Sequence, residues 1–140
     1  MDIFNLNRFL TAQEDVYLDA LSEIMQGRKR SHWMWFIFPQ FRGLGSSENA
    51  QFYAIHSLKE ARAYLEHPVL GKRLREITES LIKHKNKKVS EIFGYPDDLK
   101  LHSSLTLFEA ASEGDNVFTT ALDIFFKGRP DEKTLELLKS

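Results

Sequence analysis

Residues 11–27, TAQEDVYLDALSEIMQG, carry the pattern on which the fold class depends. Apolar side chains recur every three or four positions between Val16 and Met25, and this spacing predicts an amphipathic helix. Thr11 and Glu14 have the spacing of a capping box, in which each side chain satisfies a free amide of the first helical turn. Gly27 favours a left-handed end to the helix. The segment therefore predicts one helix over residues 11–27.

The same helical period continues through nearly all of the later sequence, and no stretch alternates apolar and polar residues for long. Ser57 and Glu60 repeat the capping-box pattern, and Pro68 suits the first position of a following helix. The helices that we expect after residue 27 span 31–37, 48–55, 58–67, 68–84, 89–93, 97–113, 115–127 and 131–139. No linker or repeat interrupts them. The sequence predicts a single all-α domain over residues 1–140, an irregular bundle of seven to nine helices.

Composition excludes several classes of function. Lys and Arg number 19 against 20 Asp and Glu, and this balance argues against a protein that binds nucleic acid backbone. The absence of cysteine excludes disulfides and thiolate metal sites, and the five histidines form no close metal-binding pair. No apolar run is long enough to span a membrane, and the N-terminus lacks the pattern of a signal peptide. We expect a cytoplasmic protein without a metal, a cofactor, a nucleic acid partner or a membrane partner.

The most unusual stretch is RKRSHWMWFIFPQFRGLGSS at residues 28–47, which contains both tryptophans. A helix of two turns cannot direct all of its aromatic side chains to one core face. Trp33 and Trp35 are about 160° apart around a helix, at 3.6 residues per turn. Some aromatic surface should therefore line a cleft or an interface. The alternative is a central helix that is apolar all round and fully buried.

The functional interpretation of this stretch is a pocket for a planar, phosphorylated small molecule. Ser31 can cap the helix and so place His32 at its positive end, which favours anions. The glycines of GLGSS allow the backbone to approach a ligand closely. The candidate ligand-binding residues are Arg30, His32, Trp33, Trp35, Gln40, Arg42, Gly45, Ser46, Lys100 and His102.

Glu48 is the candidate catalytic residue, because it directly follows the glycine-containing loop. Apolar neighbours could raise the pKa of its carboxyl and make it a general base that activates water. The alternative is structural: Ser46 or Ser47 caps the next helix, and Glu48 merely suits its first turn.

Several motifs together resemble a family of small, uncharacterised bacterial proteins whose members are sometimes mislabelled calpastatin. The motifs are SHWMWFIFPQ (31–40), GLGSS (43–47), 53–55, 60–65, HPVLGKRL (67–74) and KLHSSLTLFEAA (100–111). The resemblance implies an all-helical fold and no settled activity. Aligning the blocks 31–48 and 100–109 suggests that they meet in space to form one pocket.

A fainter resemblance is to the NADAR (YbiA-like) N-glycosidases, in which a loop before a helix reads Ser–Glu–His–aromatic. Here Ser47 and Glu48 are followed by Asn49, and by Phe52 and Tyr53. This resemblance implies hydrolysis of an N-glycosidic bond with Glu48 as the testable residue. Two hypotheses result: a protein that binds a nucleotide-like molecule, with that hydrolysis as its candidate reaction, or a non-catalytic interaction module that uses the same aromatic surface. The oligomeric state stays open.

Overall fold

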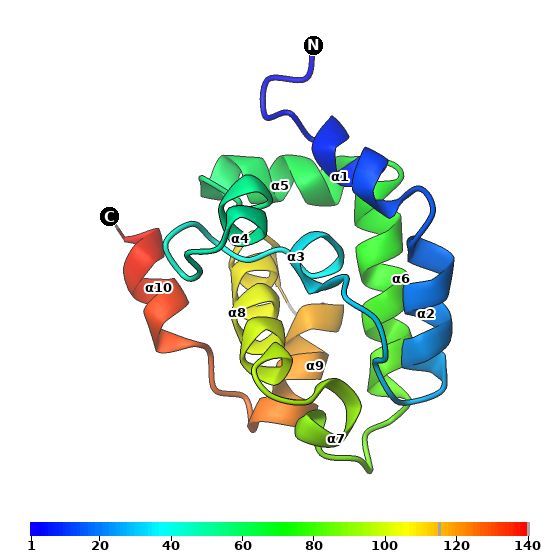
Figure 1. Ribbon diagram of the computed structural model, residues 1–140. Helices are drawn as coiled ribbons and strands as arrows, with labels where there is room; N and C mark the ends of the chain where they lie inside the picture. Colours follow the sequence, from blue (N-terminus) through cyan, green and yellow to red (C-terminus); the bar gives the residue numbers. More distant parts are fainter. Residues whose placement is uncertain (115, 140) are drawn as a thin grey trace.

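The computed structural model describes residues 1–114 and 116–139, and these fold into an all-α domain, as the sequence predicts (Figure 1). The helices are α1 (Asn7–Gln13), α2 (Tyr17–Met25), α3 (Met34–Ile37), α4 (Glu48–Phe52), α5 (Leu58–Glu66), α6 (Leu70–Ile82), α7 (Val89–Phe93), α8 (Asp97–Ala110), α9 (Val117–Phe126) and α10 (Glu132–Leu138). Among the described residues, the extended pairing is limited to one isolated parallel bridge between Phe41 and Ile55. The predicted start of a helix at Asp115 lies outside the described residues.

The helix predicted over residues 11–27 is wrong, because α1 ends at Gln13 and α2 starts at Tyr17. Thr11 lies inside α1 and caps nothing. Gln13 is 1% exposed, and its side-chain amide donates to the Phe36 carbonyl at 2.9 Å and to the Tyr64 hydroxyl at 3.0 Å. These long-range contacts outweigh the local capping signal. The break raises the number of helices in the described residues to ten, above the expected seven to nine.

Helix α8 lies at the centre of the bundle and packs against α9, α5, α10, α7 and α3 (Figure 1). Its buried residues surround the helix rather than forming one stripe, as expected for a central element. Two of the weak helix formers in HSSLT satisfy their hydroxyls by bonding back to the helix. Ser103 donates to the Leu99 carbonyl at 3.2 Å, and Thr106 donates to the His102 carbonyl at 2.8 Å.

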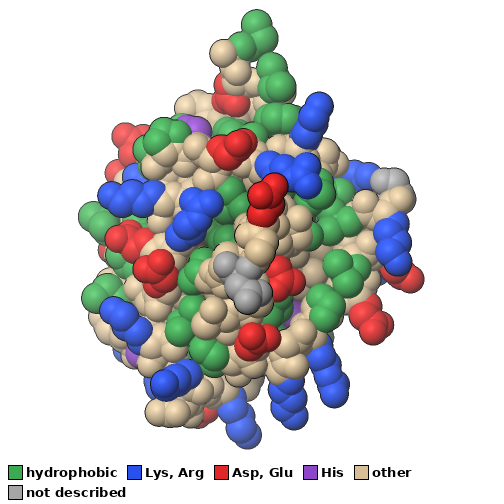
Figure 2. Space-filling model, turned by 180° about the vertical axis from the view of Figure 1, so that it is seen from behind, with side chains coloured by type: hydrophobic (Ala, Val, Ile, Leu, Met, Phe, Trp, Pro, Cys, Tyr) green, Lys and Arg blue, Asp and Glu red, His purple; other side chains and the backbone are tan. Residues whose placement is uncertain are grey.

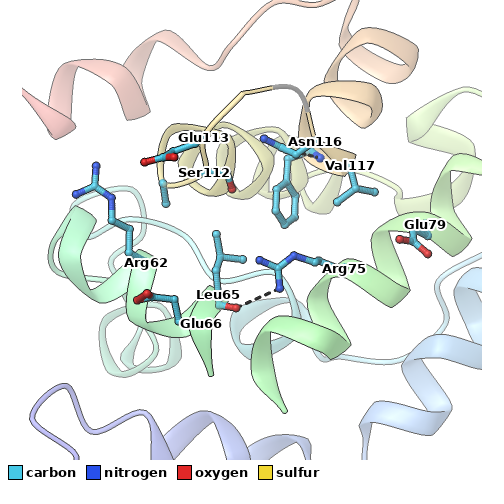
Figure 3. A pocket seen from close by; sticks show the side chains of 11 residues that line it. Arg62, Leu65, Glu66, Arg75, Glu79, Ser112, Glu113, Asn116 and Val117 are labelled. Atoms are coloured by element: carbon cyan, nitrogen blue, oxygen red, sulfur yellow. Dashed lines mark hydrogen bonds between the residues drawn. The ribbon is translucent and has the colours of Figure 1, made fainter. Parts of the chain in front are cut away.

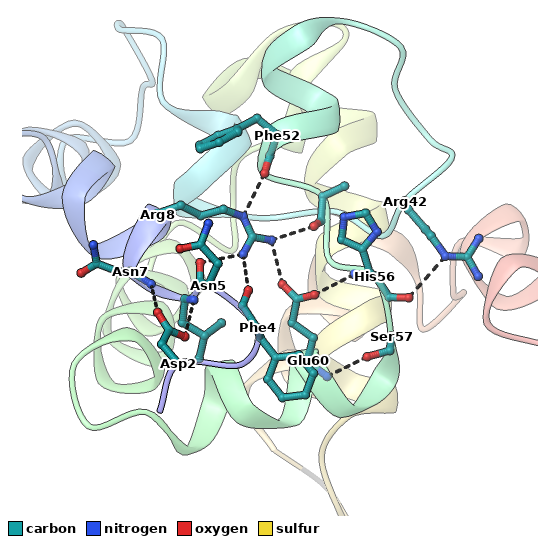
Figure 4. Close-up of polar contacts among 12 residues, drawn as sticks. Asp2, Phe4, Asn5, Asn7, Arg8, Arg42, Phe52, His56, Ser57 and Glu60 are labelled. Atoms are coloured by element: carbon teal, nitrogen blue, oxygen red, sulfur yellow. Dashed lines mark hydrogen bonds and ion pairs between the residues drawn. The ribbon is translucent and has the colours of Figure 1, made fainter.

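A buried ion pair joins the N-terminal segment to the middle of the chain (Figure 4). The Arg8 guanidinium lies 2.7 Å from the Glu60 carboxylate, and both side chains are almost fully buried. Arg8 also donates to the carbonyls of Phe52 at 2.8 Å and Ala54 at 2.9 Å. Its third nitrogen, Nη1, donates to the backbone carbonyls of residues 4 and 5. Arg8 therefore fixes the segment between α4 and α5 against α1.

Two helix starts differ in detail from the prediction. Ser57 caps α5 as expected, because its hydroxyl accepts from the Glu60 amide at 3.0 Å. The second bond of the capping box is missing. The Glu60 carboxylate accepts from the His56 amide at 3.0 Å instead of from the Ser57 amide. Helix α6 starts at Leu70 and not at Pro68. The His67 ring nitrogen Nδ1 accepts from the Leu70 amide at 3.2 Å and so takes the capping role.

The surface mixes charges of both signs. Seen from behind, Lys and Arg side chains are interspersed with Asp and Glu, without a large area of one sign on that face (Figure 2). Among the described residues, none of the helices has the length and apolar character that crossing a membrane requires.

Candidate functional site

A cavity of about 450 Å³ opens between the segment 40–50, helix α8 and the start of α10. We call it the Trp35 pocket. Its lining residues are Trp35, Gln40, Leu44, Gly45, Ser46, Ser47, Ala50, Pro96, Leu99, Lys100, His102, Ser103, Asp131 and Lys133. Six of the predicted ligand-binding residues are among them: Trp35, Gln40, Gly45, Ser46, Lys100 and His102. The structure thus brings the blocks 31–48 and 100–109 to one hollow.

The segment after α3 is held in place by its pairing with Ile55. The Ile55 amide donates to the Gln40 carbonyl at 2.9 Å, and the Arg42 amide donates to the Ile55 carbonyl at 2.9 Å. Gly45 approaches α4 so closely that a Cβ atom there would lie 2.6 Å from the Ala50 Cβ. A glycine is therefore needed where the loop packs back onto α4.

Trp35 is half-buried and forms one wall of the pocket. The Lys100 ammonium lies 5.3 Å from the centre of the indole, within the range of a cation–π contact. The same ammonium is 3.6 Å from the Asp97 carboxylate, which also pairs with Lys29 at 2.9 Å. Lys29 and Lys100 share one carboxylate, so positive charge remains beside the Trp35 ring.

His102 is held against the chain that connects α9 to α10. Its ring stacks on Phe126 with the centroids 4.1 Å apart and the planes 5° from parallel. Its Nε2 lies 2.7 Å from the Arg129 carbonyl oxygen. These two contacts fix the ring plane at the edge of the pocket.

Asp131 anchors α10 to α8. Its carboxylate accepts from the Ser103 hydroxyl at 3.1 Å, from the Thr134 amide at 3.2 Å and from the Thr134 hydroxyl at 2.5 Å. Its own amide donates to the Thr106 hydroxyl at 2.8 Å. The negative charge of Asp131 is thereby engaged by hydrogen-bond donors within the protein.

Three other lining side chains keep their polar groups available. Within the part of the chain that the structure describes, the Gln40 amide, the Ser46 hydroxyl and the Lys133 ammonium have no hydrogen bond or ion pair. Polar groups in concave sites typically supply the orientation and the specificity of ligand binding. The sequence analysis missed Lys133 and Asp131, because they lie far along the chain and Asp131 looks like an ordinary helix cap.

Four predicted binding residues lie elsewhere. Trp33 has no exposed surface, and its indole N–H donates to the Glu23 carboxylate at 3.1 Å, so the expectation that it walls the pocket is corrected. Arg42 lies over the Phe41 ring and donates to the His56 carbonyl at 3.3 Å. Arg30 and His32 are exposed and outside the lining.

Ser31 does not cap a helix, because α3 starts only at Met34. Its hydroxyl donates instead to the Glu23 carboxylate, which also accepts from the Arg30 amide at 2.6 Å. Burial raises the pKa of Glu23, but the hydrogen bonds from Ser31, Arg30 and the Trp33 indole outweigh this effect and hold the pKa below its ordinary value. His32 therefore does not lie at the positive end of a helix, and the loop 30–33 is tied to α2.

Glu48 is exposed and is not among the residues that line the Trp35 pocket. The Ser47 hydroxyl accepts from the Ala50 amide at 3.1 Å, and Glu48 occupies the first turn of α4. This arrangement matches the structural alternative, in which Glu48 suits the start of a helix.

A second cavity, of about 520 Å³, lies on the face of α5, α6 and the segment that joins α8 to α9 (Figure 3). Arg62, Glu66, Arg75 and Glu79 line it, with Arg75 donating to the Leu65 carbonyl at 3.1 Å. Its charges are mixed and no predicted site residue reaches it. Among the described residues, no group of three or more His, Cys, Asp or Glu side chains is arranged to hold a metal ion.

Comparison with known proteins gives a family and a fold. No curated protein matches the chain. A solved structure does: the conserved hypothetical protein Rv1873 from Mycobacterium tuberculosis is 49% identical, with a TM-score of 0.95 over 98% of each chain. The model of a protein family of unknown function, DUF1810, matches residues 3–138. Because that match covers nearly all of its length, the chain belongs to the DUF1810 family of proteins of unknown function.

Proposed function

We propose that the Trp35 pocket binds a small, nucleotide-like molecule that carries a planar ring and a phosphate. The observation that carries the proposal is the convergence of unpaired polar groups and a half-buried indole in one hollow. Its volume of about 450 Å³ falls within the range that is typical of small-molecule sites. A nucleotide offers both a ring for the indole and an anion for the ammonium groups.

The charges of the pocket favour an anion. Lys100 and Lys133 supply two ammonium groups, while Asp131 is already engaged by Ser103 and Thr134. A ligand phosphate can replace Asp97 as the partner of Lys100, since the Asp97 carboxylate and the Lys100 ammonium are 3.6 Å apart and only partly buried. The Trp35 face would then be free to stack on the ligand ring.

Hydrolysis with Glu48 as the base is not part of this proposal, because Glu48 lies outside the lining of the pocket. If turnover of an N-glycosidic bond is found, Glu48→Gln should leave its rate unchanged. A rate that falls a hundredfold or more would return Glu48 to the catalytic role, since general bases contribute roughly 10²–10⁴-fold.

An interaction module remains the second candidate, and a specific observation favours it. Leu99, on the wall of the pocket, is 51% exposed, and Tyr95, four residues earlier, is 81% exposed. Exposed apolar side chains of this size are common in protein interfaces. A partner chain would cover them without any small molecule.

A thermal-shift screen with adenosine 5′-monophosphate (AMP), ADP-ribose and flavin mononucleotide tests the proposal. A ligand at 100 times its dissociation constant should raise the free energy of unfolding by about 2.7 kcal/mol. Trp35→Ala should weaken that binding at least tenfold. Phe52→Ala is the matched control, because Phe52 is 55% exposed on α4 and lies outside the pocket.

Two results would contradict the proposal. One is the absence of a shift with all three ligands, and a concentration-dependent oligomer in the same samples would then favour the interaction module. The other is equal affinity of the Trp35→Ala and Phe52→Ala variants, which would place the ligand elsewhere.

A further inference from the structure

The contacts of His102 determine which of its ring nitrogens carries the proton. Nε2 lies 2.7 Å from the Arg129 carbonyl oxygen, and a carbonyl oxygen can only accept a hydrogen bond. The Nε2–H of His102 therefore donates to Arg129. In a neutral imidazole the other nitrogen, Nδ1, then keeps its lone pair and is an acceptor.

Nδ1 of His102 has no partner among the described residues. The ring cannot easily turn to exchange its nitrogens, because it is stacked on Phe126 at 4.1 Å and its Nε2 is engaged. The two fixed contacts thus preorganise an unsatisfied acceptor on a residue that lines the Trp35 pocket.

The other available polar groups of the pocket differ from Nδ1 in kind. The ammonium groups of Lys100 and Lys133 only donate, whereas the Gln40 amide and the Ser46 hydroxyl both donate and accept. In its neutral form the His102 ring therefore adds an acceptor beside donors that suit an anion. A ligand that matches this set must present a hydrogen-bond donor as well as a negative group.

We propose that His102 Nδ1 accepts a hydrogen bond from a ligand hydroxyl, an inference that rests on the proposed function. The ligand class is then a phosphorylated molecule with free hydroxyls, such as a ribonucleoside monophosphate, and inorganic phosphate alone is a poor ligand. His102 is a specificity-determining residue in this scheme, and it selects ligands by their hydroxyl groups.

Two substitutions separate this role from a structural one. A glutamine at position 102 can place its amide nitrogen near the position of Nε2 and keep the bond to Arg129, but it offers nothing at Nδ1. An asparagine reaches only the position of Nδ1. If His102 contacts the ligand, His102→Gln should lose affinity while its thermal stability stays near that of the wild type. His102→Asn should keep more affinity and lose stability.

The experiment is isothermal titration of AMP and 2′,3′-dideoxy-AMP into the wild-type protein and the His102→Gln variant. We expect the dideoxy compound to bind the wild type about tenfold more weakly, which corresponds to about 1.4 kcal/mol. His102→Gln should bind both compounds equally, at the weaker level. His84→Gln is the matched control: its Nε2 bonds the Met25 carbonyl at 3.0 Å in the same way, and it lies outside the pocket.

The outcomes distinguish the two proposals. If the wild type binds AMP and His102→Gln keeps the tenfold preference for hydroxyls, the role of His102 is overturned and the ligand site stands. If AMP and dideoxy-AMP bind the wild type equally, the hydroxyl selection is overturned. If neither compound binds the wild type, the proposed function fails, and this inference fails with it.

Discussion

Ser104 is a buried polar residue whose hydroxyl has no partner among the described residues. It is 1% exposed at the centre of α8. An unsatisfied buried hydroxyl costs about 1–3 kcal/mol, and alanine is the better helix former. We therefore expect Ser104→Ala to raise the free energy of unfolding by about 1 kcal/mol, measured by urea denaturation.

The neighbouring serine is a matched control for this substitution. The Ser103 hydroxyl shares its one proton between the Leu99 carbonyl and the Asp131 carboxylate, so Ser103→Ala should lower the free energy of unfolding by about 1 kcal/mol. A loss of stability in Ser104→Ala equal to that in Ser103→Ala would show that the Ser104 hydroxyl has a partner in solution.

The two tryptophans show the limit of helical geometry at the scale of single residues. Both are predicted from the sequence to line one pocket, whereas the structure places Trp33 in the core, before the start of α3, and Trp35 on a pocket wall. Local geometry cannot say which of the two is buried. Trp33 is the buried one, and its indole N–H donates to the carboxylate of Glu23 on α2. A contact between residues ten positions apart in different elements is invisible to a periodic pattern.

At the scale of elements, the contact between α5 and α6 depends on Gly71. A Cβ atom at this position would lie 2.0 Å from the Leu65 carbonyl oxygen, which belongs to the backbone and cannot move aside. Helix propensity alone favours alanine over glycine by about 1 kcal/mol, but overpacking typically costs 1–3 kcal/mol, and here the clash is with main chain. We expect Gly71→Ala to lower the free energy of unfolding by about 2 kcal/mol.

Lys72→Ala is the control for Gly71→Ala, since Lys72 is the next residue of the same helix and is exposed. Its effect on the free energy of unfolding should stay within about 0.5 kcal/mol, as is usual for surface substitutions. A Gly71→Ala variant as stable as the wild type would mean that α5 and α6 can separate without cost.

Most elements follow from the sequence because their apolar period and caps agree, as in α5, which starts after Ser57, and α7, which ends at Phe93, just before Gly94. The failure at residues 11–27 has a physical cause. Gln13 is polar and looks like a solvent-facing helical residue, but the fold buries its amide against Phe36 and Tyr64. A helix cap contributes about 1 kcal/mol of local stabilisation, and long-range hydrogen bonds of this kind can outweigh it.

At the scale of the whole molecule, one half of the candidate site is easier to predict from the sequence than the other half. The aromatic and glycine-rich blocks stand out by composition, and Trp35, Gly45 and His102 do lie together. The far wall consists of Asp131 and Lys133, which have no unusual composition around them. They reach the pocket only because α10 folds back onto α8, as Figure 1 shows. Tertiary arrangement of this kind cannot be read from residue spacing.

That arrangement also predicts how stability is distributed over the molecule. Helix α8 is packed on several sides, whereas α10 contacts mainly α8 and is held there by Asp131. Hydrogen exchange should therefore be slowest in α8 and α6 and faster in α10. Asp131→Ala removes an N-cap worth about 1 kcal/mol, so exchange of the α10 amides should accelerate about fivefold.

The α6 amides should be unchanged in Asp131→Ala if α10 opens independently of the rest of the bundle. Asp131→Asn is the control, because its amide oxygen can still accept from the Thr134 amide, and it should accelerate α10 less. Equal acceleration of α6 and α10 would instead show that the bundle opens as one cooperative unit. In that case the α10 wall of the Trp35 pocket would open only together with the rest of the bundle.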